Sequence, residues 1–290
     1  MAIPGPVGAY EVTIEDRPFA APGGEPLVAR VYRPLGAPPG HLLVDVHGGA
    51  WTHFDRTADA YFDGALATCG LTVVALDFRM GAAHSFQHAV ADVVGGVRWA
   101  KAHAGALGAR AERVGLIGGS SGGHLLMLAA LTPAAFAGTV VDAPDDVDAR
   151  VAYALPLWPI LDPLARYRYL RDRVANPTPA RDRFFQAERL IDAHYGFFGD
   201  EATMARASAL RVVESGEAET LPPIWIAHPE LDENVTLPMT ERFVAAYRRA
   251  GGTAELSVFH GVGHSFANFP GDAADGCIAQ MRAFIASQLV

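Results

Sequence analysis

Two segments of the chain carry side chains that hydrolysis through a serine would require. The first is Gly118-Gly-Ser-Ser-Gly-Gly123, where an apolar run breaks into glycines around two serines and restarts as an apolar helical pattern. A serine on a tight strand-to-helix turn presents its hydroxyl clear of the backbone, and glycines two positions before and after it leave room for that turn. The G-x-S-x-G pattern fits twice, so Ser120 and Ser121 are both candidate nucleophiles.

The second segment supplies the groups that such a serine needs, because a hydroxyl is a weak nucleophile without a base and an acid behind it. Residues 228–235 offer Asp232 as the acid, with Glu230 and Glu233 as competitors, and a later loop offers His264 as the base, with His260 as the runner-up. Each candidate follows an apolar run with the character of a strand. The carboxyl ends of parallel strands are where such a sheet places its ligands.

A glycine-rich loop adds backbone donors to this set. It reads His47-Gly-Gly-Ala-Trp51 and follows the apolar run Leu42–Val46. Glycines let backbone N–H groups approach a ligand that a side chain would block. Taken alone, the same residues fit a simple turn that leads out of a strand.

Together these segments resemble the motifs of α/β-hydrolase serine esterases related to hormone-sensitive lipase and of kynurenine-formamidase-like hydrolases. The register G-x-S-x-G-G-x-L favours Ser120 as the nucleophile. The segment similar to H-G-x-x-D-x-x-V marks Asp232 as the acid, and the one similar to G-x-x-H-x-F marks His264 as the base. The chain order Ser, Asp, His is the order of that family's catalytic triad.

The resemblance also implies an oxyanion hole. The loop 47–51 is similar to the family's H-G-G-x-W loop, so we expect the backbone N–H groups of Gly49, Ala50 and Ser121 to donate to the tetrahedral oxygen. Each donor of this kind is typically worth roughly 3 kcal/mol of transition-state stabilisation.

Two positions depart from the family's pattern, and one further segment agrees with it. Gly119 precedes the nucleophile where lipase-like relatives often have Asp, and Ala50 stands in place of the third glycine of the oxyanion loop. The segment Asp77-Phe-Arg79 is similar to the family's D-Y-R, and we expect a structural salt bridge between its two charged residues.

Short apolar runs alternate with helical patterns along the chain, which is typical of an α/β fold with a doubly wound, mostly parallel sheet. The expected strands are 27–32, 42–46, 72–76, 114–117, 151–155, 224–227 and 255–259, with an antiparallel hairpin over 10–33 at one edge. The expected helices are 58–68, 86–103, 124–131, 237–250 and 274–289. The resemblance implies an eight-stranded α/β-hydrolase sheet within a single domain of residues 1–290.

A long insertion interrupts this alternation. Residues 156–221 contain no obvious strand and many aromatic side chains, and a connection of this length is rarely idle. We expect a helical cap over the active site, with a substrate pocket walled by Trp51, Trp158, Tyr195 and Phe198. The alternative is a set of ordinary surface helices whose aromatic side chains face the core.

Composition limits the partners. Half of the 290 residues are hydrophobic, and the formal net charge of -9 would repel nucleic acid. Cys69 and Cys277 fit no metal-ligand spacing, so we expect buried free thiols, and no metal or cofactor is implied. The first residues show no basic region followed by an apolar core, which favours a cytoplasmic protein with no membrane partner. A homodimer is kept as a candidate assembly.

These observations predict a serine hydrolase that cleaves a small carboxylic ester through an acyl-enzyme, with specificity for acyl chains of roughly two to six carbons. An amidase or formamidase of the kynurenine-formamidase type is the alternative enzyme, since it would use the same groups. A ligand-binding protein that has lost catalysis is the alternative from another class.

Overall fold

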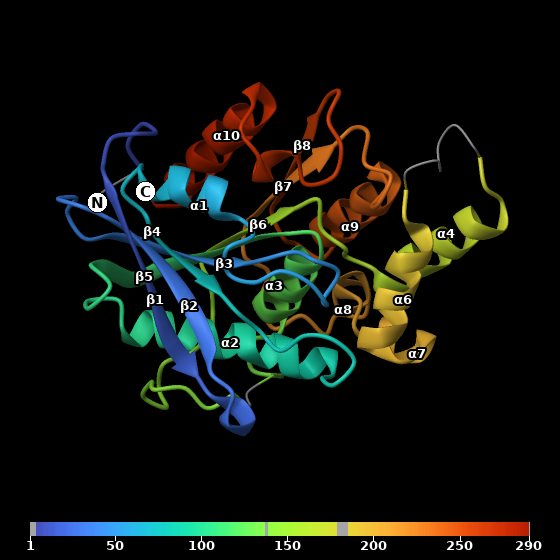
Figure 1. The fold of residues 1–290 in the computed structure, drawn as a ribbon, viewed down its shortest axis with the longest axis horizontal. Coiled ribbons are helices and arrows are strands. Elements are labelled where there is room, and N and C mark those ends of the chain that lie inside the picture. Colours follow the sequence, from blue (N-terminus) through green and yellow to red (C-terminus); the bar gives the residue numbers. More distant parts are fainter. Residues whose placement is uncertain (1–3, 137–138, 179–184, 290) are drawn as a thin grey trace.

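The computed structural model describes residues 4–136, 139–178 and 185–289, and its centre is an eight-stranded sheet (Figure 1). The strands are β1 (Val12–Ala20), β2 (Leu27–Pro34), β3 (Gly40–Val46), β4 (Thr72–Leu76), β5 (Ala109–Gly119), β6 (Tyr153–Leu157), β7 (Ile224–Pro229) and β8 (Ala254–Phe259). They lie in the order β1-β2-β4-β3-β5-β6-β7-β8. The hairpin β1-β2 and the pair β2-β4 are antiparallel, and the other neighbours are parallel. The predicted doubly wound, mostly parallel sheet is therefore confirmed.

Helices follow most of the strands. They are α1 (Ala60–Ala67), α2 (Phe86–Ala102), α3 (Ser121–Leu131), α4 (Pro163–Ala175), α6 (Ala187–Phe198), α7 (Glu201–Arg206), α8 (Ala209–Glu214), α9 (Leu237–Arg249) and α10 (Asp272–Gln288), with short 3-10 turns at Pro22–Gly24 and Phe266–Asn268. The largest difference from the sequence expectation is that β5 begins at Ala109 rather than Val114. Its polar first residues pair with the start of β3 through the backbone, which side-chain patterns do not reveal.

The sheet has a packed layer on each face. Every residue of β3 and β4 is buried, as expected for central parallel strands covered on both sides. Side chains alternate along β3, so Val44 faces the core formed with α2, α3, α8 and α9, while Leu43 faces the core formed with α1 and α10. This two-sided packing fixes the strand ends from which the site loops emerge (Figure 1).

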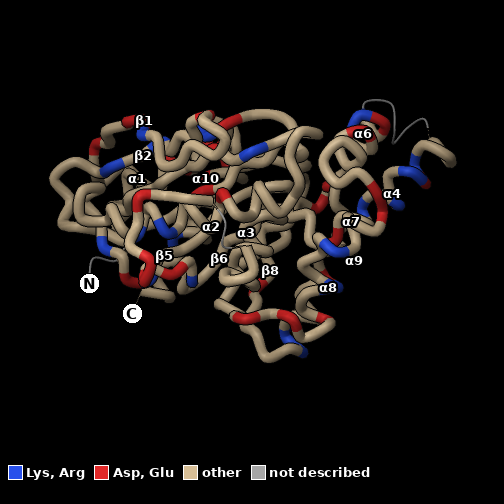
Figure 2. The backbone as a smooth tube through the Cα atoms, turned by 90° about the horizontal axis from the view of Figure 1, so that it is seen from below, with Lys and Arg blue, Asp and Glu red and all other residues tan. Residues whose placement is uncertain are grey.

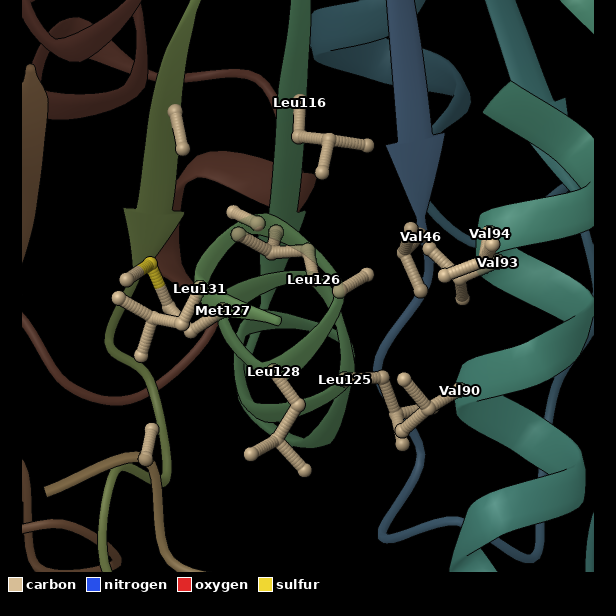
Figure 3. Close-up of a cluster of buried hydrophobic side chains, with 14 of the residues drawn as sticks. Val46, Val90, Val93, Val94, Leu116, Leu125, Leu126, Met127, Leu128 and Leu131 are labelled. Carbon is tan, nitrogen blue, oxygen red and sulfur yellow. The ribbon is translucent and has the colours of Figure 1, made fainter. Parts of the chain in front are cut away.

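Helix α3 is buried over its whole length, and it begins at the serine turn. Figure 3 shows Leu125 of α3 beside Val90 of α2, and Leu126 together with Leu116 of β5 and Val46 of β3. A helix that is apolar on all sides is held between other elements, so its first turn has little freedom to move.

The insertion between β6 and β7 is helical in its described part, which holds α4, α6, α7 and α8. Residues 179–184 of the expected cap lie outside the described residues. Helices α4, α6 and α7 pack together at one end of the molecule (Figure 1), whereas α8 packs on α3 and α9. Within the region expected to form the cap, α4, α6 and α7 lie together and are called the cap below, whereas α8 belongs to the core layer.

Two smaller expectations have opposite outcomes. Cys69 and Cys277 are buried and free, as predicted. The salt bridge expected within Asp77-Phe-Arg79 is wrong, because Asp77 pairs with Arg56 at 3.0 Å and Arg79 pairs with the buried Asp92 at 2.7 Å. Both true partners come from other segments of the chain. Among the described residues, no helix combines the length and hydropathy that a membrane crossing requires.

Three buried carboxyl groups lie between the sheet and α1. They belong to Asp45 on β3, Asp59 immediately before α1 and Asp63 in its first turn. Burial and repulsion from their acidic neighbours raise the pKa of Asp45 and Asp63 well above the ordinary value, and burial raises the pKa of Asp59 to about 7. Neither Asp45 nor Asp63 has a hydrogen-bond partner for its carboxyl oxygens in the described structure. The folded structure therefore favours the protonated form of these carboxyl groups.

This cluster predicts a stability that falls as pH rises. A carboxyl whose pKa is raised by folding contributes fully below its unfolded value near 4 and loses that contribution as pH passes the folded value, which is about 7 for Asp59. Asp63→Asn should therefore raise the melting temperature at pH 8 by roughly 2–8 °C, corresponding to about 1–2 kcal/mol, and by less at pH 5. The measurement is calorimetry at both pH values.

Asp146→Asn is the matched control, because Asp146 is exposed and forms no hydrogen bond or ion pair with any described residue. It should leave the melting temperature unchanged at both pH values. Equal shifts at pH 5 and pH 8 for Asp63→Asn would contradict a role for ionisation.

Candidate active site

The turn between β5 and α3 holds Ser120 in a backbone conformation that non-glycine residues rarely adopt, with φ 55° and ψ -117°. The neighbouring strand end fixes this geometry, because the Ser120 N–H donates to the Leu157 carbonyl at 2.9 Å. The Ser120 carbonyl in turn accepts from the Ile160 N–H at 3.1 Å and the His124 N–H at 3.2 Å. These hydrogen bonds to the end of β6, to the residues after it and to the first turn of α3 hold Ser120 in its strained conformation.

The flanking glycines distinguish the two serine registers. A Cβ at Gly118 or Gly122 would overlap the Val46 carbonyl oxygen, so both positions require glycine for the approach of β3 to the turn. Ser121 is fully buried, and its Oγ accepts the Trp51 N–H at 3.2 Å. Only the Ser120 hydroxyl of the two lines a cavity in the described structure.

The structure brings the predicted acid and base to Ser120. His264 Nδ1 lies 2.8 Å from Asp232 Oδ2, and His264 Nε2 lies 2.9 Å from Ser120 Oγ. An ionised carboxylate can only accept, so Nδ1–H donates to Asp232 and Nε2 is free to accept the serine proton. The three side chains come from loops at the ends of β5, β7 and β8.

The competing residues are engaged elsewhere. Glu230 pairs with His260 at 3.3 Å and accepts the Gly261 N–H, and the His260 side chain is 81% exposed. Glu233 pairs with Arg173 at 2.8 Å. In the described part of the chain, none of the three forms a hydrogen bond with the side chain of Ser120 or His264.

Asp232 stays ionised despite its burial. Desolvation would raise its pKa, but the His264 charge and hydrogen bond, together with the N–H groups of Val235 and Asn234, hold the pKa below the ordinary value. Those two amides donate to Oδ1 at 2.9 and 2.8 Å, which leaves Oδ2 for the imidazole. The carboxylate is therefore oriented as well as charged.

The loop after β3 supplies backbone donors beside Ser120. Gly49 has φ 110°, and a Cβ there would overlap the His53 carbonyl oxygen, while Ala50 has φ 52°. Among the described residues the N–H groups of Gly49, Ala50 and Ser121 have no acceptor. Gly49 and Ala50 line the cavity at Ser120, whereas Ser121 is buried next to Ser120 in the chain. These three N–H groups therefore remain candidates for the oxyanion hole.

The cavity at Ser120 has a volume of about 200 Å³. Its wall mixes apolar and polar groups: Gly48, Gly49, Ala50, His53, Phe54, Ala58, Asp59, Gly119, Ser120, Trp158, Arg189, Leu190, Asn234, His264, Ser265 and Asn268. Leu190 and Arg189 come from α6, so the cap does contribute to the wall.

Three of the four predicted pocket residues do not line this cavity. Trp158 does, but Trp51 is fully buried, Phe198 is buried against it, and the half-exposed Tyr195 packs on Tyr167. These aromatic side chains stabilise the attachment of the cap and leave the wall to other residues.

The attachment itself explains where Trp51 points. Its indole Nε1–H donates to His124 Nδ1 at 3.1 Å, and His124 Nε2 lies 2.7 Å from the carbonyl of Ala207, next to α7. Burial lowers the pKa of His124 to about 4, so the ring is neutral and can accept at one nitrogen while it donates at the other. This chain of contacts links the oxyanion loop to the cap.

Sequence reasoning missed several residues of the wall. Arg189 lies on α6, and Asn234 contacts Arg166 of α4. His53 and Asp59 come from the segment between β3 and α1, and Asn268 comes from the 3-10 turn after β8. The position of Asn234 two residues after Asp232 was the one local signal that could have identified it.

Comparison with known proteins identifies the family of this chain. Residues 43–268 match the family model described as alpha/beta hydrolase fold, and the chain belongs to that family. It is 28% identical over 275 residues to Esterase LipQ of Mycobacterium tuberculosis, and this alignment covers 91% of this chain and 60% of that protein. It is 32% identical over 106 residues to an Arylesterase of Saccharolobus solfataricus, covering 36% of this chain and 35% of that protein.

Solved structures agree with the fold. Est2 of Thermogutta terrifontis, a thermophilic esterase with propionate bound, superimposes with a TM-score of 0.70 at 22% identity and covers 96% of this chain and 94% of its own. The chain spans 60% and 53% of the lengths of the curated relatives LipQ and LipC. Within the described residues, no group of His, Cys, Asp and Glu side chains is arranged to hold a metal ion.

The two serines can be separated by substitution. Ser120→Ala should reduce hydrolysis of 4-nitrophenyl acetate to the background rate, because it removes the hydroxyl beside His264. Ser121→Ala keeps the backbone N–H and should retain most activity, although loss of the acceptor for the Trp51 N–H should cost about 1–3 kcal/mol of stability. Initial rates and melting curves measure the two effects. The reverse pattern of activity would assign the nucleophile to Ser121.

The acid can be tested by paired isosteres. Asp232→Asn should lower kcat by about 10⁴, because the amide can no longer hold the imidazole in the tautomer that accepts from Ser120. Glu233→Gln, at a neighbouring carboxylate that pairs with Arg173, serves as control and should change kcat by less than about threefold. A greater loss for Glu233→Gln than for Asp232→Asn would show that the acid is misassigned.

Proposed function

We propose that this protein is a serine esterase that cleaves small carboxylic esters, with Ser120, Asp232 and His264 as the catalytic triad. The observation that carries the proposal is the continuous hydrogen-bond path from Asp232 through His264 to the strained Ser120, at distances of 2.8 and 2.9 Å. Such a path is the arrangement by which a base activates a hydroxyl and a carboxylate orients the base.

Acylation begins when the Ser120 hydroxyl attacks the ester carbonyl. His264 Nε2 takes the hydroxyl proton as the carbon–oxygen bond forms, and Asp232 stabilises the imidazolium. The tetrahedral intermediate then collapses, the alkoxy group leaves with the proton from His264, and an acyl-serine ester remains. A water molecule, deprotonated by His264, attacks this ester, and the acid and free Ser120 are released.

The backbone donors stabilise both tetrahedral intermediates. The N–H groups of Gly49, Ala50 and Ser121 lie free beside the nucleophile and are held by strand and helix ends, so they need no rearrangement as negative charge develops. The start of the buried helix α3 adds its positive dipole end at the same point.

Several features support an ester as the substrate. The relatives reported above are described as esterases, which favours an ester over the amide or formamide alternative. The intact path between the three side chains argues against a protein that only binds ligands. The proposal keeps a small-molecule ester as the partner, no nucleic acid and a cytoplasmic location, on the sequence grounds given above.

The cavity size sets the expected chain-length preference. In a cavity of about 200 Å³, each methylene that fits should add about 0.8 kcal/mol of binding until the space is filled. Across 4-nitrophenyl esters, kcat/KM should therefore peak at acyl chains of roughly two to six carbons and fall for longer ones. Steady-state rates from acetate to decanoate measure this preference.

Leu190→Ala should move the optimum to longer chains, because Leu190 lies in the cavity wall and packs against the cap. Val174→Ala, on the exposed side of the same insertion, is the control and should leave the optimum in place. Equal rates on short and long esters would contradict a wall set by the cap, and the absence of any ester hydrolysis would contradict the proposed function.

A further inference from the structure

The cap side of the cavity is rich in hydrogen-bond donors. Arg189 and Asn234 face it there, beside the apolar Leu190. The only carboxyl in the described wall is that of Asp59, which is buried, hydrogen-bonded to Asn268 and raised in pKa to about 7. A wall of this kind offers donors to an oxygen-rich group beside the apolar surface that takes hydrocarbon.

Arg189 is a cation without an acidic partner in the described structure. The other arginines of the cap helices that face neighbouring segments are engaged: Arg168 and Arg171 pair with Glu201, and Arg173 pairs with Glu233. Within the described residues Arg189 forms no ion pair or hydrogen bond, and it is exposed. Figure 2 shows the basic positions of α4 and α6 at the cap end of the molecule. The Arg189 guanidinium is therefore available to a ligand in the cavity.

Asn234 presents a second donor, and its orientation is fixed by chemistry. Arg166, which is buried, donates to the Asn234 backbone carbonyl from Nε at 3.1 Å and to the side-chain oxygen Oδ1. A guanidinium has donors only, so Oδ1 must face Arg166 and the amide nitrogen must point away from it. That nitrogen has no acceptor among the described residues, and Asn234 lines the cavity.

Arg166 also adds positive charge behind this wall. It has no carboxylate within salt-bridge distance in the described structure, and Asp232 is the acidic group that interacts with it electrostatically. Burial lowers its pKa to about 9, so the guanidinium is charged at neutral pH. The net charge of -9 on the whole chain acts on a ligand mainly over longer distances. Salt screens such interactions beyond about 8 Å at physiological ionic strength.

We propose that the cavity takes esters that carry a second, ionised carboxylate, and that Arg189 and the Asn234 amide bind this carboxylate. The inference rests on the proposed function, since the scissile ester is placed by Ser120 and the oxyanion donors. It names the substrate class as small half-esters of dicarboxylic acids or esters of small hydroxy acids. Recognition by a guanidinium and an amide N–H suits the planar geometry of a carboxylate.

The test compares matched neutral and anionic esters by pH-stat titration. Monoethyl succinate against ethyl butyrate places the charge on the acyl side, and O-acetylglycolate against ethyl acetate places it on the alcohol side. We expect wild-type protein to show a higher kcat/KM for the anionic member of at least one pair. The pair that shows the preference identifies the side on which the carboxylate binds.

Substitutions connect that preference to the proposed residues. Arg189→Gln should reduce the anionic-to-neutral ratio of kcat/KM about tenfold, and Arg189→Lys should reduce it less. Asn234→Asp keeps an acceptor for Arg166 but replaces the amide donor by a negative group, so it should also reduce the ratio. Arg249→Gln makes the same charge change at an exposed site on α9 and should leave the ratio as in the wild type.

The outcomes separate the two levels of the account. No hydrolysis of any ester by wild-type protein would overturn the proposed function itself. Hydrolysis of the neutral esters without preference for either anionic ester, or an unchanged ratio in both Arg189→Gln and Asn234→Asp, would overturn the carboxylate site and leave the esterase proposal standing. An equal fall of the anionic-to-neutral ratio of kcat/KM in Arg249→Gln would attribute the preference to the overall charge of the protein and would also overturn the carboxylate site.

Discussion

The arrangement of the site depends on the close approach of β3 to the turn that carries Ser120. At Gly118 and Gly122 that turn touches the Val46 carbonyl, and only glycine fits at either position. The contact does two things at once. It packs the turn of Ser120, with φ 55°, against the end of β3, and it brings the loop after β3 beside the hydroxyl. The proposed nucleophile and the proposed oxyanion donors of that loop therefore depend on the same packing.

The other chemical groups are positioned in a similar way, through the ends of buried strands. The loops after β7 and β8 carry Asp232 and His264, and the parallel pairing of these strands places the two loops side by side. The cap adds a second support, because Arg166 and Arg173 from α4 bind the residues that follow Asp232. The insertion therefore does more than cover the cavity, since it also anchors the loop that carries the acid.

Local patterns were sufficient for much of this. The apolar runs located the strands, and the motifs singled out Ser120, Asp232 and His264, whose side chains lie within hydrogen-bond distance of one another. Each of these motifs is a turn at a strand end whose conformation depends on its own residues. The cavity wall was harder to predict. Trp51 points into the core because His124 and the cap hold it, and Arg189 faces the cavity through the placement of a whole helix. Neither contact involves neighbours in sequence.

The central claim is that the Ser120 hydroxyl, activated by His264, forms the covalent intermediate. The most direct measurement is to treat the protein with diisopropyl fluorophosphate and to locate the adduct by peptide mass spectrometry, with a His264→Ala sample in parallel. The account predicts one phosphorylated residue, Ser120, and strongly slowed labelling in the His264→Ala sample. An adduct on Ser121, or ester hydrolysis that continues in protein fully labelled at Ser120, would contradict it.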